Sequence, residues 1–71
     1  MAKQERIKNT VYEHRVGASI TQEDLAQRVG VTRQTIISIE KGNYDPSVLL
    51  ALKIAAVFKV PLEKVFYIAY E

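Results

Sequence analysis

Apolar residues recur along most of this chain at the three- and four-residue spacing of an amphipathic helix, and seldom at the two-residue alternation of a strand. In the N-terminal part, one apolar stripe consists of Ile7, Val11, His14 and Ala18. This spacing predicts a first helix that begins between Gln4 and Asn9 and ends near Gly17.

Two short helices are predicted next, each preceded by a residue suited to cap its N-terminus. Thr21 precedes the apolar positions of residues 22–29, and Gly30 follows them with the conformational freedom that a helix C-terminus needs. Thr32 is the expected cap of a third helix over residues 33–41. Only three residues therefore join these two helices.

The C-terminal third begins with Ser47, the expected cap of a fourth helix over residues 48–58, which is apolar on almost every side. Pro61 is placed to open a short fifth helix. The tail over residues 66–71, FYIAYE, alternates and is rich in β-formers. The prediction is an all-α fold, a five-helix bundle with a short β-prone C-terminal tail.

The composition indicates one small domain over residues 1–71, with 1–8 as an arm or the start of the first helix and 67–71 as a tail. A core of this size is marginal, and without cysteine neither disulfides nor a cysteine-type zinc site can reinforce it. A single histidine cannot hold a metal. We therefore expect no metal, no cofactor and no small-molecule effector, and we expect oligomerisation to supply the missing stability.

Charge and hydropathy give weaker indications. Ten lysines and arginines against eight acids leave a net charge of +2, which permits a nucleic-acid partner without requiring one. No segment has the apolar length of a membrane span, and MAKQERIKNT lacks the apolar run of a signal peptide, so we expect a cytoplasmic protein. No nucleophile, base and acid are matched in the sequence, and we expect no enzymatic activity.

The spacing of the second and third helices is that of a helix-turn-helix, in which the second helix of the pair lies in the DNA major groove. Ala26 provides a small side chain where the helices cross, and Gly30 takes the turn. The residues expected to hold the pair together are Leu25, Val29, Val31, Ile36 and Ile39.

On these motifs the chain resembles the Cro/repressor-like helix-turn-helix family, often called XRE. The resemblance rests on the pattern TQ…LA…VGV and on the run RQTI…IEKG.Y.PS…ALKIA. It implies a dimeric DNA-binding regulator of transcription with a five-helix bundle. Three departures are local: Ser19 and Lys59 stand where the family usually has glycine, and Gly17 lies two residues before Ser19.

The resemblance also implies roles for individual residues. Gln22 would bind a DNA phosphate, and Glu40 would form a buried pair with Arg15. The residues that would face the groove are Thr32, Arg33, Gln34 and Ser38.

Ile37 occupies an unusual place for an apolar residue. At about 100° per residue it shares a helix face with Arg33, Gln34 and Lys41, away from Ile36 and Ile39. Arginine suits the acceptors of guanine, glutamine suits adenine, and an apolar side chain suits the methyl group of thymine. The interpretation is that Ile37 contacts a thymine methyl, and the alternative is that it packs against the fourth helix.

For several other positions, two interpretations remain open. Arg33 and Gln34 contact bases or form a solvated face, and the preceding turn motif favours base contact. Lys41, Arg28 and Lys8 contact phosphates or are simply solvated. The DNA-contacting set is Gln22, Thr32, Arg33, Gln34, Ile37, Ser38 and Lys41.

The predicted function is a sequence-specific regulator that binds double-stranded DNA as a homodimer on a near-palindromic operator, most simply a repressor. The alternatives are a protein-interaction module and the DNA-binding component of a toxin–antitoxin or restriction-control system. We expect the tail to pack on its symmetry mate, for instance as an antiparallel strand pair. The alternative is that the tail folds back over its own bundle. The expected dimer interface is Leu50, Val57, Phe66, Tyr67, Ile68 and Tyr70.

Overall fold

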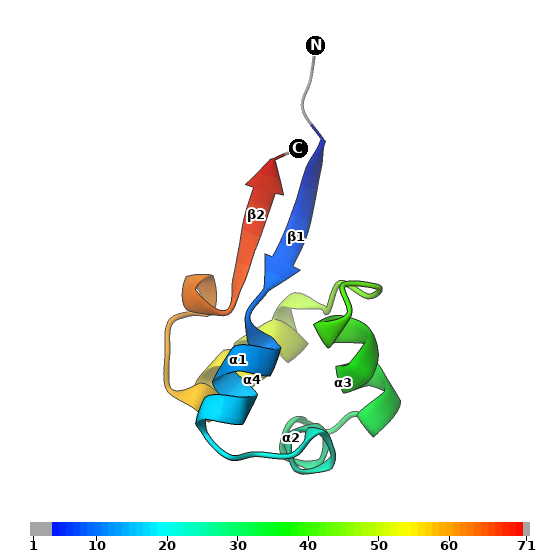
Figure 1. The fold of residues 1–71 in the computed structure, drawn as a ribbon, viewed down its shortest axis with the longest axis vertical. Helices are drawn as coiled ribbons and strands as arrows, with labels where there is room; N and C mark the ends of the chain where they lie inside the picture. Colours follow the sequence, from blue (N-terminus) through cyan, green and yellow to red (C-terminus); the bar gives the residue numbers. More distant parts are fainter. Residues whose placement is uncertain (1–3, 71) are drawn as a thin grey trace.

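The structure, a computed structural model, describes residues 4–70 as four α-helices, one turn of 3-10 helix and two antiparallel strands. The elements are β1 (Glu5–Asn9), α1 (Val11–Gly17), α2 (Gln22–Val29), α3 (Arg33–Glu40), α4 (Val48–Phe58), η1 (Leu62–Lys64) and β2 (Phe66–Tyr70). The helices form one body, and the two strands project from it side by side, so the molecule measures 42 × 23 × 21 Å (Figure 1).

The second, third and fourth predicted helices are confirmed, together with their caps. Thr21, Thr32 and Ser47 each accept a hydrogen bond from the backbone N–H three residues later, at 3.0, 3.2 and 3.1 Å. Gly30 adopts the left-handed conformation, with a φ of 78°. Local capping thus sets where these helices begin and how α2 ends.

The core lies where the four helices meet. Its largest fully buried side chains are Val11, Leu25, Ile36, Ile39, Ile54 and Val65. They come from α1, α2, α3, α4 and the residue before β2, so each segment contributes to one hydrophobic cluster. At about 1.5–3 kcal/mol for each large buried side chain, this cluster is the main favourable term in folding.

The predicted start of the first helix is wrong. Glu5–Asn9 forms β1, and α1 begins only at Val11. Asn9 separates the two, because its side chain accepts from the backbone N–H of Val11 at 3.1 Å and donates to the carbonyl of Ile39 at 2.9 Å. The helical spacing of Ile7 was therefore coincidental, since this residue lies in the sheet.

The predicted five-helix bundle is also wrong, because the fifth helix is reduced to the single turn η1. Val65 follows it directly, is fully buried, and accepts a hydrogen bond from the backbone N–H of Thr10 at 2.8 Å. This contact ties the chain to the junction of β1 and α1, from which it continues as β2. The β-prone tail does form a strand, but that strand pairs with β1 of the same chain.

The two strands give the sheet two different faces. Ile7 lies opposite Ile68 on one face, and Lys8 lies opposite Tyr67 on the other. Side chains alternate along a strand, so one face is largely apolar and the other carries charge.

Helix α4 presents apolar side chains both to the core and to the surface. Leu50 and Ile54 are buried, whereas Val48, Leu49 and Leu52 are exposed. Leu50, expected at a dimer interface, thus packs in the core of its own chain. Among residues 4–70, no helix is long and apolar enough to cross a membrane.

Ser19 and Lys59 both have a positive φ, at 57° and 58°. These are the two positions where the resembled family usually has glycine. A residue with a Cβ in this conformation costs about 1–2 kcal/mol, so the chain tolerates strain at two of its turns.

Substitutions at Gly30 and Lys59 should have different effects on stability. Gly30→Ala should lower the free energy of unfolding by about 1 kcal/mol, because a Cβ at this position meets no atom within 4 Å and the cost is purely conformational. Lys59→Gly should raise it or leave it unchanged, because the relief of strain offsets the added entropy of the unfolded chain. Urea unfolding followed by circular dichroism at one protein concentration measures both. Equal losses in the two variants would contradict this account.

Candidate nucleic-acid interface

The turn between α2 and α3 is closed by backbone hydrogen bonds. The N–H groups of Gly30 and Val31 both donate to the carbonyl of Ala26, at 2.9 and 3.0 Å. Ala26 is fully buried, as a close crossing of the helices requires. The predicted helix-turn-helix geometry is therefore present.

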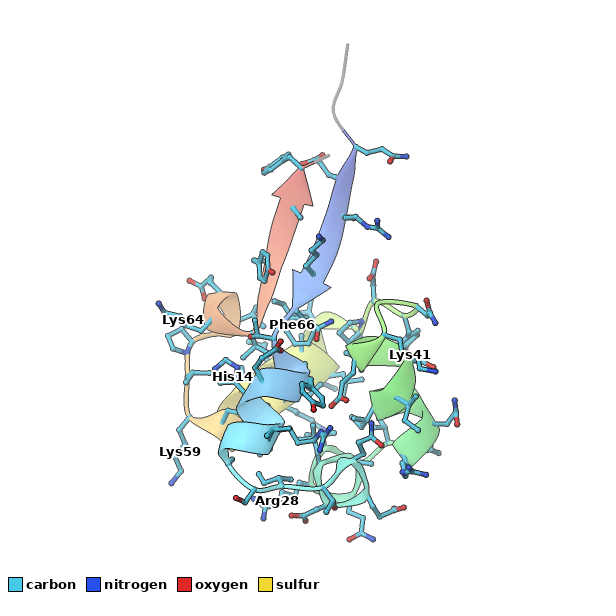
Figure 2. All side chains as sticks on the ribbon, viewed as in Figure 1. His14, Arg28, Lys41, Lys59, Lys64 and Phe66 are labelled. Atoms are coloured by element: carbon cyan, nitrogen blue, oxygen red, sulfur yellow. The ribbon has the colours of Figure 1, made fainter. Side chains whose placement is uncertain are left out.

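The side chains of α3 divide between the core and the outer surface, as the helical spacing predicted. Ile36 and Ile39 are fully buried. Arg33 and Gln34 are exposed at the N-terminal end of the helix, as is the cap Thr32. Figure 2 shows α3 at the edge of the helical body, where its outer side chains extend away from the core.

The remaining predicted contact residues lie along or beside the same helix. Ile37 and Ser38 are half-buried, and Lys41 is exposed directly after α3 ends. Ile37 is thus neither a core residue nor fully solvated. Gln22 is half-buried at the first position of α2.

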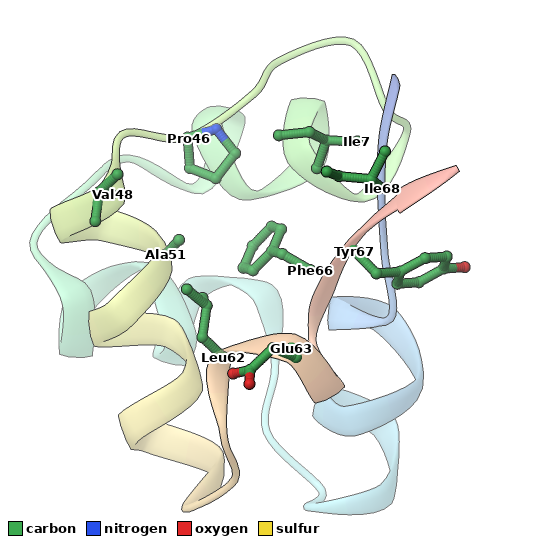
Figure 3. A pocket seen from close by; sticks show the side chains of 9 residues that line it. All are labelled: Ile7, Pro46, Val48, Ala51, Leu62, Glu63, Phe66, Tyr67 and Ile68. Carbon is green, nitrogen blue, oxygen red and sulfur yellow. The ribbon is translucent and has the colours of Figure 1, made fainter. Parts of the chain in front are cut away.

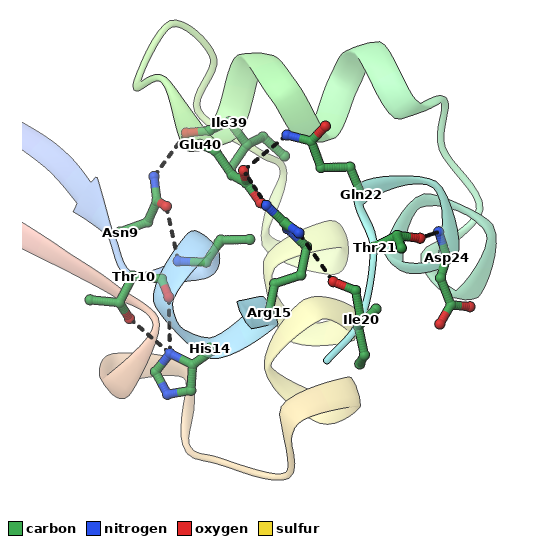
Figure 4. A network of polar contacts seen from close by, with 11 residues as sticks. Asn9, Thr10, His14, Arg15, Ile20, Thr21, Gln22, Asp24, Ile39 and Glu40 are labelled. Atoms are coloured by element: carbon green, nitrogen blue, oxygen red, sulfur yellow. Dashed lines mark hydrogen bonds and ion pairs between the residues drawn. The ribbon is translucent and has the colours of Figure 1, made fainter. Parts of the chain in front are cut away.

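A network of polar contacts holds α3 in place from behind (Figure 4). Arg15 on α1 donates to both carboxylate oxygens of Glu40, from Nε at 2.7 Å and from Nη2 at 3.2 Å. Its remaining Nη1 donates to the carbonyl of Ile20 at 3.1 Å. The resemblance implied this pair, and the structure confirms it. The hydrogen bond to Glu40 raises the pKa of Arg15, so the guanidinium stays charged at any physiological pH.

Gln22 belongs to this network as well. Its side-chain Nε2 donates to Oε1 of Glu40 at 3.2 Å. Because a glutamine amide carries two N–H donors, this contact fixes the side chain and leaves one donor for a further partner. One carboxylate therefore links α1, α2 and α3.

The sequence pattern assigned Asn43 no functional role and favoured packing over base stacking for Tyr44. They lie in the loop after α3 and line a shallow hollow together with Gln34 and Ser38. Tyr44 is 48% exposed. The one feature of the sequence that pointed to them was their position directly after α3, where the loop lies beside the outer face of that helix.

Other chemistry finds little support in the part of the chain that the structure describes. Residues 4–70 contain no group of three or more histidine, cysteine or acidic side chains that could hold a metal ion. His14 lies at the edge of the core, where its Nδ1 is 3.0 Å from the carbonyl of Thr10 and its ring packs near Phe58.

Comparison with known proteins agrees with this geometry. A family model described as helix-turn-helix matches residues 11–65, which cover α1 through η1. The chain belongs to the helix-turn-helix family. At this coarse level, the chain is a DNA-binding regulator of transcription.

Relatives and solved structures support the assignment. The chain is 55% identical over 60 residues to a protein of Methanocaldococcus jannaschii named as the uncharacterised HTH-type transcriptional regulator MJ0272, covering 84% of this chain and 91% of that protein. It is 51% identical over 65 residues to the similarly named YgzD of Bacillus subtilis, covering 92% and 98%. The crystal structure of the restriction-modification controller protein C.AhdI from Aeromonas hydrophila superposes with a TM-score of 0.71 at 26% identity, over 76% of this chain and 82% of that one.

Proposed function

We propose that this chain is a sequence-specific double-stranded DNA-binding regulator that acts as a repressor and binds a near-palindromic operator as a homodimer. The observation that carries the proposal is the exposed outer face of α3, with Arg33 and Gln34 at its N-terminal end. Repression requires only that the operator be occupied, whereas activation also requires a contact with the transcription machinery.

The outer face of α3 offers three kinds of contact to base edges. Arg33 can donate two hydrogen bonds to guanine, and the amide of Gln34 can both donate to and accept from adenine. Ile37 lies beside them and can contact the methyl group of thymine. The contacting set is Gln22, Thr32, Arg33, Gln34, Ile37, Ser38 and Lys41.

The Glu40 network suits this role because base readout requires a helix that does not shift. A contact displaced by a fraction of an ångström loses the directional hydrogen bonds on which discrimination depends. Gln22, held by Glu40, would offer its second N–H to a phosphate at the start of α2.

The exposed apolar surface supports a homodimer. Ile7 and Ile68 are 42% and 55% exposed on one face of the sheet. With Val48 and Phe66 they line a groove between the sheet and the start of α4, from which Tyr67 points away (Figure 3). One recognition helix buries little DNA, and a two-fold dimer would place two such helices about 34 Å apart, one helical turn of DNA.

Among the residues expected at the dimer interface, those on β2 are therefore better candidates than those on α4. Ile68 and Tyr70 are exposed and share the face of the groove, and Tyr67 is exposed on the opposite face. Phe66 and Val57 are half-buried, and Leu50 is inside the core.

A restriction-control role is the second candidate, favoured by the likeness to the controller protein C.AhdI. It uses the same DNA-binding face and differs only in the gene that is regulated. A protein-docking module fits less well, because protein interfaces are depleted of charge at their centre and the outer face of α3 carries Arg33 with Lys41 beyond it.

Alanine substitutions at Arg33 and Gln34 test base readout. Each should weaken binding to the preferred duplex by about 1–3 kcal/mol and relax the preference at one base pair, because the lost hydrogen bonds go to base edges. Binding to random duplexes should change much less. Fluorescence anisotropy titrations of both duplexes measure the difference.

The matched control is Gln27→Ala, which removes an exposed glutamine from α2 rather than α3. It should leave both affinities unchanged. If Arg33→Ala and Gln34→Ala lose the same affinity on preferred and random DNA, these residues do not specify bases.

Charge introduced into the groove tests the dimer. Ile68→Lys should convert a dimer into a monomer at micromolar concentration, because the apolar face would then bury an unpaired ammonium group. Val16→Lys is the control, since Val16 is 52% exposed on α1 and does not line the groove. Sedimentation equilibrium measures the mass. A dimer that persists in Ile68→Lys would place the interface elsewhere.

A further inference from the structure

A second hollow lies between β1 and the end of α3. It is lined by Arg6, Lys8, Glu40, Lys41, Asn43 and Tyr67, among others. The strand side of this hollow arises because Lys8 and Tyr67 are cross-strand partners on the face of the sheet opposite Ile7 and Ile68. The hollow therefore contains the lysine and arginine side chains of β1, which do not line the apolar groove, although Ile7 and Tyr67 border both.

The charges in this hollow are predominantly positive. Among the residues from 4–70 that line it, Glu40 is the only acidic one, and its carboxylate is 7% exposed and already bound by Arg15 and Gln22. Within residues 4–70, the ammonium groups of Lys8 and Lys41 and the side-chain amide of Asn43 make no hydrogen bond or ion pair. Two cations and an amide donor thus face the hollow without an internal partner.

This surface is continuous with the outer face of α3. Asn43 lines both this hollow and the shallow hollow that contains Gln34 and Ser38. Lys41 directly follows the last residue of α3. A long polyanion lying along α3 would therefore also pass over the hollow.

We propose that this hollow binds a phosphate of the DNA backbone beside the groove that α3 reads, with Lys8 and Lys41 as the cationic contacts and Asn43 as a neutral donor. This inference rests on the proposed DNA-binding function and extends the contact surface beyond the helix-turn-helix, onto β1. Two flexible lysines at an open surface suit a polymer whose position is already fixed by other contacts. They would hold a small free anion only weakly.

The salt dependence of binding tests the inference. Each phosphate contact contributes about 0.9 to the slope of log affinity against log salt concentration. The double variant Lys8→Ala/Lys41→Ala should reduce that slope by about 0.9 per bound chain and weaken binding about eightfold at about 0.1 M salt, and each single variant should produce part of this loss. The loss should be the same on the preferred duplex and on random duplexes, because a phosphate carries no sequence information.

Two further variants act as controls. Lys8→Arg keeps the charge and should keep the slope of wild type. Lys64→Ala removes a lysine from the opposite side of the molecule, where Figure 2 shows it, and should also leave the slope unchanged.

The outcomes separate this inference from the proposed function. If Lys8→Ala and Lys41→Ala keep the wild-type slope while Arg33→Ala loses specific binding, the hollow does not contact DNA, Lys41 leaves the contacting set, and base readout by α3 stands. If Lys8→Ala instead lowers the mass in sedimentation without changing the slope, the hollow contacts a second copy and the inference is overturned. If the wild-type chain binds no duplex, both the proposed function and this inference fail.

Discussion

The buried pair of Arg15 and Glu40 is the interaction on which the placement of α3 depends. The two side chains are only 11% and 7% exposed, so the loss of hydration is large, and it is offset by three hydrogen bonds, one from each nitrogen of the guanidinium. One contact goes to the carbonyl of Ile20 and the others go to Glu40, which also accepts from Gln22. A pair of this kind adds little net stability. Its effect is to allow one orientation of α3 relative to α1 and α2.

The pair of Arg15 and Glu40 holds α3 on its inner side, and this leaves the outer side chains of the helix available for a partner. The cap Thr32 bonds to Thr35 in its own turn, while the side chains of Arg33 and Gln34 make no hydrogen bond or ion pair within residues 4–70. Asn9 anchors the C-terminal end of α3, because its side chain donates to the carbonyl of Ile39. The same side chain accepts from the N–H of Val11, at the junction where β1 ends and α1 begins. The position and orientation of the sheet relative to α3 are therefore fixed. The apolar face and the charged face of the sheet consequently have defined positions beside α3.

Local signals explain which parts of the fold were predictable. Helices α2, α3 and α4 each begin at a hydroxyl cap, and their apolar spacing is set within one segment. β1 could not be found in this way, because Glu5–Asn9 contains one aliphatic residue and becomes a strand only by pairing with Phe66–Tyr70, about sixty residues later. The same reason hides part of the site. Arg33, Gln34 and Ile37 follow from helical spacing, whereas the approach of Lys8 to Lys41 requires knowing the sheet.

Base readout by the outer face of α3 in a two-fold dimer is the central proposal for this protein. Selection of bound sequences from a random duplex pool tests this most directly. The expected result is an enriched inverted repeat with half-site centres about one helical turn apart, each half containing a guanine, an adenine and a thymine at positions that Arg33, Gln34 and Ile37 can reach. Binding without any enriched sequence would contradict the account, because it would show that α3 contacts only the DNA backbone.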